Sequence, residues 1–300
     1  MKRRLVWVGL VAVLLVTAVG LAVAFDPAAR VRGWVNGEPF FQGRSASAWR
    51  RELRNPDEVA ASAAAESLAA GKAEAVPVCV WLLQHAPEAQ VRSRATDALG
   101  KMGKDAAPAG GDLVAALSDS DPLVRAAAVR AIGGLAPDVP GAVPALVTLF
   151  PEREAIRAVA KFKEAGAAAV PKLTELTKHA DGAVRRQAVR TLGKIGTPAL
   201  PALPDLIALT TGDPDGGVRE QSAEAIGDIG PAAADGIPAL VKAMKDPEAM
   251  VRRDAVRALG QMGPTAKGVL ADVKVLIDDP NKDVKEAATR AARLIDPAGN

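Results

Sequence analysis

The residues best suited to catalysis or metal binding are few and scattered along the chain. The two histidines, His85 and His179, are each followed by Ala rather than by an acidic residue. The single cysteine, Cys79, lies in the apolar stretch VPVCVWLL, where a buried, unreactive thiol is typical. The chain has no Cys/His cluster with zinc spacing, no GxSxG and no glycine-rich phosphate loop. The sequence therefore predicts no catalytic residue, no metal site and no cofactor.

Charged side chains form a second group, and their spacing is regular. Val-Arg pairs recur at a regular spacing, at Val91-Arg92, Val124-Arg125, Val184-Arg185, Val218-Arg219 and Val251-Arg252. Successive copies are 33, 60, 34 and 33 residues apart, and a related pair, Val284-Lys285, follows after another 33. A period of this length is the signature of a repeat architecture.

Three consecutive copies also carry paired charges two and six residues after the valine. The pairs are Arg186 and Arg190, Glu220 and Glu224, and Arg253 and Arg257. Residues four apart share one face of a helix, so the pairs form a strip whose sign alternates. A groove for nucleic acid would need one sign throughout, and no nucleic acid is predicted as a partner. Two interpretations stay open: neutralising contacts between adjacent helices, or a surface on the concave side that a protein partner recognises.

The elements that position these charges are predicted to be helices. Val251, Ala255, Leu259 and Met262 are spaced by four, four and three residues, which places them on one helical face. Glycine, as at Gly260 and Gly263, is expected to end such a helix. A preceding helix is indicated by the dipeptides VP, LP or IP, because proline is tolerated at the first helical position. Such two-helix units bury their apolar faces only by stacking.

Eight units can be counted. The gap of 60 residues contains a shortened unit, because AIRAVAKF at residues 155–162 matches AVRTLGKI at residues 188–195 and about six residues are missing before it. An earlier, diverged copy begins at Asn55. One position marks each unit: Leu68, Leu99, Ile132, Val159, Leu192, Ile226, Leu259 and Ala292. The sequence thus predicts an all-α fold, a right-handed α-solenoid of about eight two-helix repeats with a polar last unit.

The pattern DPxxxVRxxAxxALGxxG resembles the HEAT-repeat family, in the short bacterial form of phycobilisome lyase proteins, over about residues 45–296. The resemblance implies that an Asp and an Arg six residues apart link neighbouring repeats in a ladder. The matching pairs are Asp119/Arg125, Asp213/Arg219, Asp246/Arg252 and Asp279/Lys285. Ala86 and His179 stand where Asp is expected, and the shortened unit lacks both members. We therefore expect the ladder to be interrupted there.

The resemblance also bears on activity. HEAT-like deoxyhypusine hydroxylases hold two irons with His-Glu pairs, and neither His85 nor His179 is part of such a pair. A bilin lyase activity would rest on fold analogy alone. The predicted function is a non-enzymatic scaffold for protein–protein interaction. The alternative is a HEAT-like lyase or protein-modification subunit that acts with a catalytic partner.

The N-terminus predicts export. Residues 5–25 form an uncharged run of 21 residues after MKRR. About 20 apolar residues span a bilayer, and positive charge stays on the cytoplasmic side. The run is either an uncleaved signal anchor or a signal peptide cleaved after Ala24. Its length favours the anchor, which places the solenoid outside the cytoplasm on a membrane tether. Cleavage would give a secreted protein instead.

The remaining boundaries follow from composition. Residues 26–44 show no period and are predicted to be a linker, and residues 45–300 form the solenoid. Four aromatic residues near this junction, Trp34, Phe40, Phe41 and Trp49, are expected to cover the open first end of the domain or to contact the membrane interface. The chain has 38 basic and 35 acidic residues, and the three cations of MKRR account for the difference. No general attraction to anionic lipid or nucleic acid is predicted.

Overall fold

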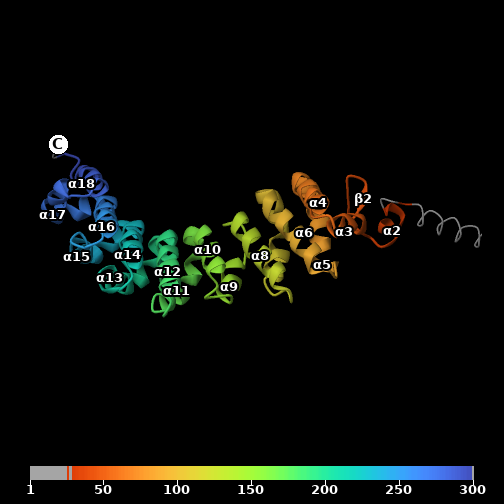
Figure 1. Cartoon of the computed structure of the whole chain (residues 1–300), viewed down its shortest axis with the longest axis horizontal. Coiled ribbons are helices and arrows are strands. Elements are labelled where there is room, and N and C mark those ends of the chain that lie inside the picture. The colour runs from red at the N-terminus through yellow and green to blue at the C-terminus, as the bar shows by residue number, and fades with distance from the viewer. Residues whose placement is uncertain (1–25, 27–28, 299–300) are drawn as a thin grey trace, which may run out of the picture. The chain divides into compact units, whose positions relative to one another are not determined.

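The computed structural model describes residue 26 and residues 29–298. The predicted membrane anchor at residues 5–25 lies outside the described residues. Within them, none of the helices combines the length and the apolar character that crossing a bilayer requires. The chain divides between Val139 and Pro140 into two compact units, and Figure 1 gives the order of their elements.

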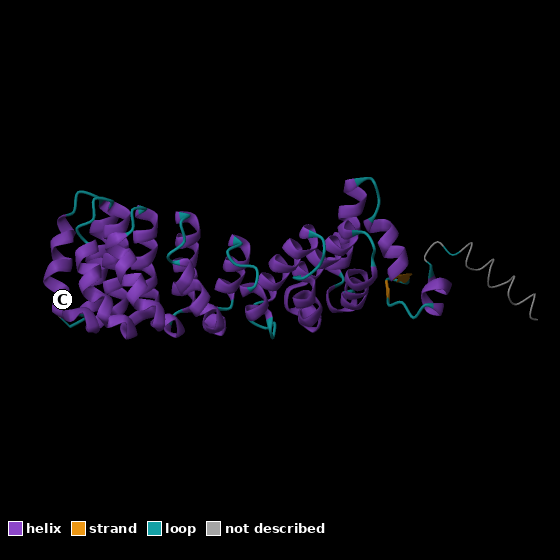
Figure 2. Cartoon of the chain, turned by 90° about the horizontal axis from the view of Figure 1, so that it is seen from below, coloured by secondary structure: helices purple, strands orange, loops and turns teal. Residues whose placement is uncertain are grey.

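The first unit starts with helix α2 (Arg30–Val35) and a short antiparallel hairpin of β1 (Phe40–Phe41) and β2 (Arg44–Ser45). Figure 2 shows this hairpin in orange. Three helix pairs follow: α3 (Ala46–Leu53) with α4 (Glu58–Ala70), α5 (Val76–His85) with α6 (Ala89–Met102), and α7 (Gly110–Ala116) with α8 (Pro122–Leu135). Two 3-10 turns, η1 (Lys72–Glu74) and η2 (Gly103–Ala109), connect successive pairs.

The second unit contains five helix pairs. They are α9 (Ala142–Val147) with α10 (Arg153–Lys161), α11 (Val170–Leu176) with α12 (Gly182–Ile195), α13 (Leu203–Gly212) with α14 (Gly216–Ile229), α15 (Ile237–Ala243) with α16 (Ala249–Met262), and α17 (Leu270–Val275) with α18 (Lys282–Ile295). The 3-10 turns are η3 (Lys163–Ala169), η4 (Thr197–Ala202), η5 (Gly230–Gly236), η6 (Gly263–Val269) and η7 (Leu276–Asp278). The described residues therefore form eight helix pairs of an all-α repeat solenoid, with the hairpin as a small addition.

The second helix of each pair forms where the apolar spacing predicts it. In α16 the four residues of the predicted apolar face, Val251, Ala255, Leu259 and Met262, are at most 1% exposed. Most second helices begin at an Asp or Asn whose side chain accepts the main-chain N–H two residues later, as Asp181 does in α12 and Asp215 in α14. This cap satisfies a donor that the helix itself leaves unpaired.

Glycine has two different roles in these helices, and one differs from the prediction. Gly263 ends α16 with a φ of +60°, as expected. Gly260 instead lies inside α16, where a Cβ atom would come within 2.9 Å of the Cα of Ala291 on α18. A Cβ at Gly227 would likewise lie 2.7 Å from the Cα of Ala258. Glycine at this position therefore lets consecutive second helices pack closely, because no side chain separates their backbones.

The shortened repeat is confirmed as a helix pair with a truncated second helix. Helix α10 has 9 residues, whereas α12 has 14. The shortening lies in the helices themselves, because α9 and α10 have 6 and 9 residues whereas α11 and α12 have 7 and 14. The boundary between the two compact units lies immediately before this repeat.

Residues 26–44 differ from the predicted linker, because they contain α2 and the hairpin. Phe41 and Trp49 are both buried, with ring centroids 5.7 Å apart, and the Trp49 Nε1 donates to the Phe41 carbonyl oxygen at 3.1 Å. Buried Glu38 accepts the main-chain N–H of Ser47 at 2.8 Å. Two-residue strands are too short to show a period, which is why the sequence does not reveal them. Trp34 is 80% exposed, so not all of the aromatic residues cover this end.

Candidate functional site

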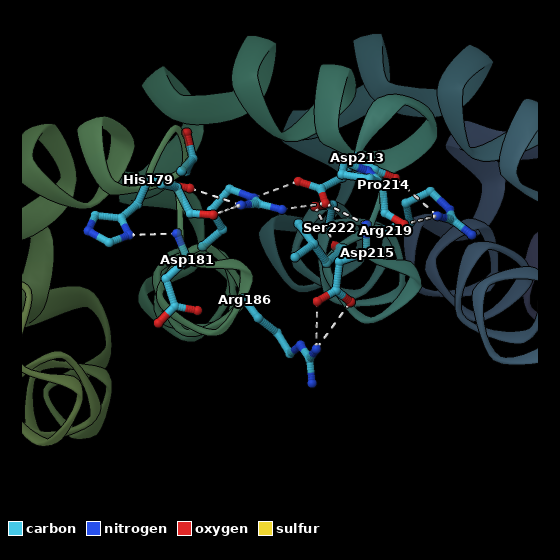
Figure 3. A network of polar contacts seen from close by, with 12 residues as sticks. His179, Asp181, Arg186, Asp213, Pro214, Asp215, Arg219 and Ser222 are labelled. Carbon is cyan, nitrogen blue, oxygen red and sulfur yellow. Dashed lines mark hydrogen bonds and ion pairs between the residues drawn. The ribbon is translucent and has the colours of Figure 1, made fainter.

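An arginine of one repeat binds the aspartate of the next repeat with two parallel hydrogen bonds. In the second unit, Nε and Nη2 of Arg185 each lie 2.8 Å from a carboxylate oxygen of Asp213, which is labelled in Figure 3. The other rungs are Arg92 with Asp119 (2.9 and 2.8 Å), Arg219 with Asp246 (2.7 and 3.1 Å) and Arg252 with Asp279 (2.8 and 3.0 Å). Bidentate, charge-assisted bonds of this kind fix both partners in one geometry.

The spacing of six residues has a separate meaning, since it brings the arginine to the main chain of its own repeat. Nη1 of Arg219 donates to the carbonyl oxygen of Asp213 at 3.0 Å, and Nη1 of Arg252 donates to that of Asp246 at 2.9 Å. In three of the four pairs predicted from the family pattern, the arginine therefore meets the backbone of its aspartate. The carboxylate of each of these aspartates binds the arginine of the preceding repeat instead. One guanidinium thus ties the turn of its own repeat to the turn of the next.

Two members of the predicted ladder make no ion pair among the described residues. Arg125 donates to the carbonyl oxygens of Asp119 and Ser120 at 2.9 and 3.0 Å, and to no carboxylate. The shortened repeat that follows Arg125 has lost the equivalent aspartate. The side chain of Lys285, in the last repeat, makes no hydrogen bond or ion pair in the part of the chain that the structure describes. Arg125 and Lys285 therefore form no rung of the ladder among the described residues.

At the two positions where the ladder aspartate is absent, Ala86 and His179, other contacts take its place. Near Ala86, the carboxylate of Glu88 accepts Nε and Nη2 of Arg50 at 2.8 and 2.7 Å, and these bonds lower the pKa of Glu88 to about 2. His179 uses Nδ1 to accept the main-chain N–H of Asp181 at 3.0 Å. Asp213 caps its own turn in the same way. His179 therefore takes over the capping role of the aspartate. The shortened repeat before it lacks the ladder arginine that would bind a carboxylate at this position.

The ladder carboxylates are largely shielded from solvent. The Asp213, Asp246 and Asp279 side chains are 3%, 9% and 7% exposed. Hydrogen bonds from Arg252 hold the pKa of Asp279 below its usual value, and Arg92 does the same for Asp119. Burial by itself raises the pKa of Asp246, but the bonds from Arg219 and from a main-chain N–H lower it overall. This is the electrostatic pattern of a structural network.

The charged strip is only partly joined by ion pairs. Arg253 on α16 contacts Glu220 on α14 at 3.3 Å, and Glu224 contacts Lys194 on α12 at the same distance. Arg186 binds Asp215, the cap of α14, at 2.9 Å rather than either glutamate of the strip. Arg190 is exposed and has no side-chain partner among the described residues. The strip therefore combines internal neutralisation on α14 and α16 with unpaired charge on α12.

A buried carboxylate that sequence reasoning missed lies beneath the strip. Asp254 is 2% exposed, and its carboxylate accepts hydrogen bonds from Nε and Nη2 of Arg253 at 2.8 and 2.9 Å. It also accepts Nη1 of Arg257 at 3.1 Å. Burial and the proximity of Asp254 raise the pKa of Glu220. The signal in the sequence is an acidic residue three positions after Val251, where the two preceding repeats have glutamine.

The histidines and the cysteine occupy structural positions. His85 stacks on Trp81 with ring centroids 4.8 Å apart, and its Nδ1 lies 3.0 Å from the Trp81 carbonyl oxygen. Cys79 is buried as predicted, and burial raises the pKa of its thiol to about 12. Among the described residues no cluster of three or more His, Cys, Asp or Glu side chains is arranged to hold a metal ion.

Sequence comparison identifies the family that this geometry represents. Models of HEAT repeats match residues 112–139, 151–226 and 203–293. The stacked helix pairs and the arginine–aspartate ladder place this protein in the class of α-solenoids. The matches to the HEAT-repeat models show that the chain is a HEAT-repeat protein. A comparison with curated protein sequences finds no match.

Solved structures share the fold at low identity. An engineered protein from the Northeast Structural Genomics Consortium aligns with a TM-score of 0.56 and 22% identity over 83% of this chain and 78% of its own. The complex of CpcE and CpcF of phycocyanin lyase from Nostoc sp. PCC7120 aligns with a TM-score of 0.43 and 22% identity, over 50% of this chain and 97% of its own. A designed armadillo repeat protein in complex with the peptide (KR)4 aligns with a TM-score of 0.40 and 22% identity, over 82% of this chain and 98% of its own. These likenesses concern the fold alone.

Proposed function

We propose that this HEAT-repeat protein is a non-enzymatic scaffold that binds a partner protein along the second helices of its second unit. The observation that carries the proposal is the strip on α12, α14 and α16, which repeats its charged positions from helix to helix. Arg186, Arg190 and Arg257 remain largely exposed even after the ion pairs are formed. Charges arranged in register on a rigid solenoid can select a partner by complementarity and accelerate its association.

A groove next to this strip supports the same surface. It has a volume of about 340 Å³ between α16 and α18, and Arg253, Arg257, Gln261, Glu286, Arg290 and Leu294 contribute to its lining. Leu294 is about half exposed there, which offers a partner an apolar contact beside charged ones. Three of the lining residues, Arg253, Arg257 and Arg290, are arginines, a residue type that is enriched at protein interfaces.

The absence of enzymatic activity is part of the proposal. It is supported by the roles of the polar residues, because the ladder arginines and aspartates bind one another and His179 caps a turn. Catalytic groups have perturbed pKa values in clefts, whereas most of the lowered carboxyl pKa values here belong to inter-repeat pairs.

The location is proposed from the N-terminus. We infer that residues 5–25 anchor the chain in a membrane with the solenoid outside the cytoplasm, and that cleavage after Ala24 is the alternative. The uncharged run after MKRR supports this topology. The exposed Trp34 and Val35 on α2 follow the run closely, and tryptophan is common at the membrane–water interface.

The binding proposal is tested by cross-linking the tagged full-length chain in membranes and capturing what is attached. The variant Glu220→Lys/Glu224→Lys reverses the acidic part of the strip. The control Glu74→Lys/Asp105→Lys makes the same charge change at exposed positions of the first unit. We expect the first variant to lose the cross-linked protein and the control to retain it. Equal capture by both variants, with unchanged melting temperatures, would place the interface elsewhere.

A further inference from the structure

The shortened repeat contributes a basic row that aligns with the first helix of the strip. On α10 the row is Arg153, Arg157 and Lys161, and on α12 it is Arg186, Arg190 and Lys194. Each residue of the first row precedes its counterpart by 33 positions, which is the repeat length. All six side chains are exposed. Because their spacing is four residues, each row lies on one face of its helix.

Helix α10 packs directly on α12 in this register. The Thr191 hydroxyl donates to the Ile156 carbonyl oxygen at 3.3 Å, and Nε of Arg157 donates to Oε1 of Gln187 at the same distance. Packed helices lie about 8–10 Å apart, and eight residues of helix extend about 12 Å. The two rows therefore bring six cations together on a face of about that size.

The face is only partly neutralised by the chain itself. Arg157 binds Glu154 at 2.9 Å, Lys194 binds Asp228 at 2.7 Å, and Arg186 binds Asp215. The other three cations, Arg153, Lys161 and Arg190, have no side-chain partner among the described residues. They come from both helices and so mark positions that an external anion would occupy.

The negative charges on the next second helix, α14, limit the extent of this basic face and restrict the kind of partner that can bind it. The equivalent row on α14 is acidic and consists of Glu220, Glu224 and Asp228. A duplex nucleic acid carries one charge per about 1.7 Å along its axis and would be repelled where it met this row. A short acidic peptide segment ends or changes sign before it reaches α14, so it meets no repulsion.

We propose that α10 and α12 form a docking face for an acidic segment of a partner protein. Carboxylates of the segment bind Arg153, Lys161 and Arg190, and a basic continuation of the segment would reach the acidic row on α14. The proposal names the chemistry of the partner and rests on the protein-binding function proposed above. The strip predicted from the sequence lies on α12, α14 and α16 and does not include the row on α10. The shortened repeat lacks the Val-Arg pair from which the positions of the strip were counted.

The test measures fluorescence anisotropy of a labelled ten-residue peptide of alternating Glu and Ser with the full-length chain in detergent. The variant Arg153→Glu/Lys161→Glu/Arg190→Glu reverses the three unpaired cations. The control Lys242→Glu/Lys245→Glu/Lys274→Glu makes the same charge change at exposed lysines that lie on or next to α15 and α17. At low salt we expect the first variant to weaken peptide binding at least about tenfold and the control less than about threefold, since each exposed pair contributes modestly and reversal adds repulsion.

Each other outcome has a defined meaning. Equal affinity of both variants, or no binding by the wild-type chain, overturns the acidic-segment proposal. A thymidine hexanucleotide that binds more tightly than the peptide and loses affinity in the same variant would assign the face to nucleic acid and overturn it as well. If the charge reversal lowers the melting temperature, the neutral variant Arg153→Gln/Lys161→Gln/Arg190→Gln replaces it in the binding measurement. The cross-linking assay separates this proposal from the scaffold function. If the reversal variant still captures the partner protein but Glu220→Lys/Glu224→Lys does not, the docking face on α10 and α12 is refuted and the scaffold function stands.

Discussion

Arg219 joins two repeats by binding the carboxylate of Asp246 through Nε and Nη2 and the carbonyl oxygen of Asp213 through Nη1. The side chain of Arg219 is 12% exposed and that of Asp246 is 9% exposed. The pair is thus shielded enough to contribute to stability, unlike an ion pair on an open surface. Arg92, Arg185 and Arg252 repeat this arrangement, so each of these rungs joins two neighbouring repeats.

Loss of one rung has a measurable cost. Arg219→Ala should lower the free energy of unfolding by about 1–3 kcal/mol, because it leaves a buried carboxylate and a main-chain carbonyl without their donor. A double-mutant cycle by urea denaturation, followed by circular dichroism, should show coupling with Asp246→Ala. Much weaker coupling is expected with Asp213→Ala, since Arg219 contacts only the backbone of that residue. Arg125→Ala is the matched control, with a smaller effect. Absence of coupling with Asp246→Ala would contradict the rung.

Acidification should destabilise the first unit in a defined window. The Glu88 pKa of about 2 and the lowered pKa of Asp119 lie below those of the unfolded chain, so the folded state is stabilised above the unfolded pKa values. That stability is lost as the pH falls from about 4.5 towards 2. The fluorescence of Trp49 and Trp81 reports on this unit. Glu88→Gln should lower stability at pH 7 and reduce the loss on acidification. An unchanged slope below pH 4.5 would contradict the assignment.

The buried Asp254 should control the ionisation of Glu220. Asp254→Asn removes the nearby negative charge, so the pKa of Glu220, which burial and Asp254 raise, should fall. The same change weakens the bonds from Arg253 and Arg257 and should cost about 1–3 kcal/mol of stability. Carbon-13 NMR titration of labelled glutamate gives the pKa, and Gln221→Asn is a control at the equivalent position of α14. A rise in the pKa of Glu220 would refute the proximity effect.

Fractionation tests the predicted anchor. The tagged full-length chain should sediment with membranes and resist both high salt and carbonate, because a run of 21 uncharged residues inserts too strongly to be released by charge screening. A chain that lacks residues 1–25 is the control and should be recovered in the supernatant. A soluble mature form whose first residue is Phe25 would show cleavage after Ala24 instead.

The sequence by itself determined the features that depend on local period. The apolar spacing within 14 residues identifies α16 and its equivalents, and the match between residues 155–162 and 188–195 reveals the shortened repeat. These signals are readable because helix formation, capping and face selection are decided by residues within about one or two turns. The eight helix pairs could be counted for the same reason.

Only the tertiary structure decided which residues meet across repeats. Asp246 binds an arginine 27 residues earlier rather than the one six residues later, and Asp254 is buried although its position in α16 reads as polar. Gly260 serves a helix crossing instead of a helix end, and Glu38 fixes a hairpin that has no detectable period. Each of these depends on the packing register of elements about 10–30 residues apart. That register follows from the volume and approach of neighbouring helices, which the pattern within one helix does not contain.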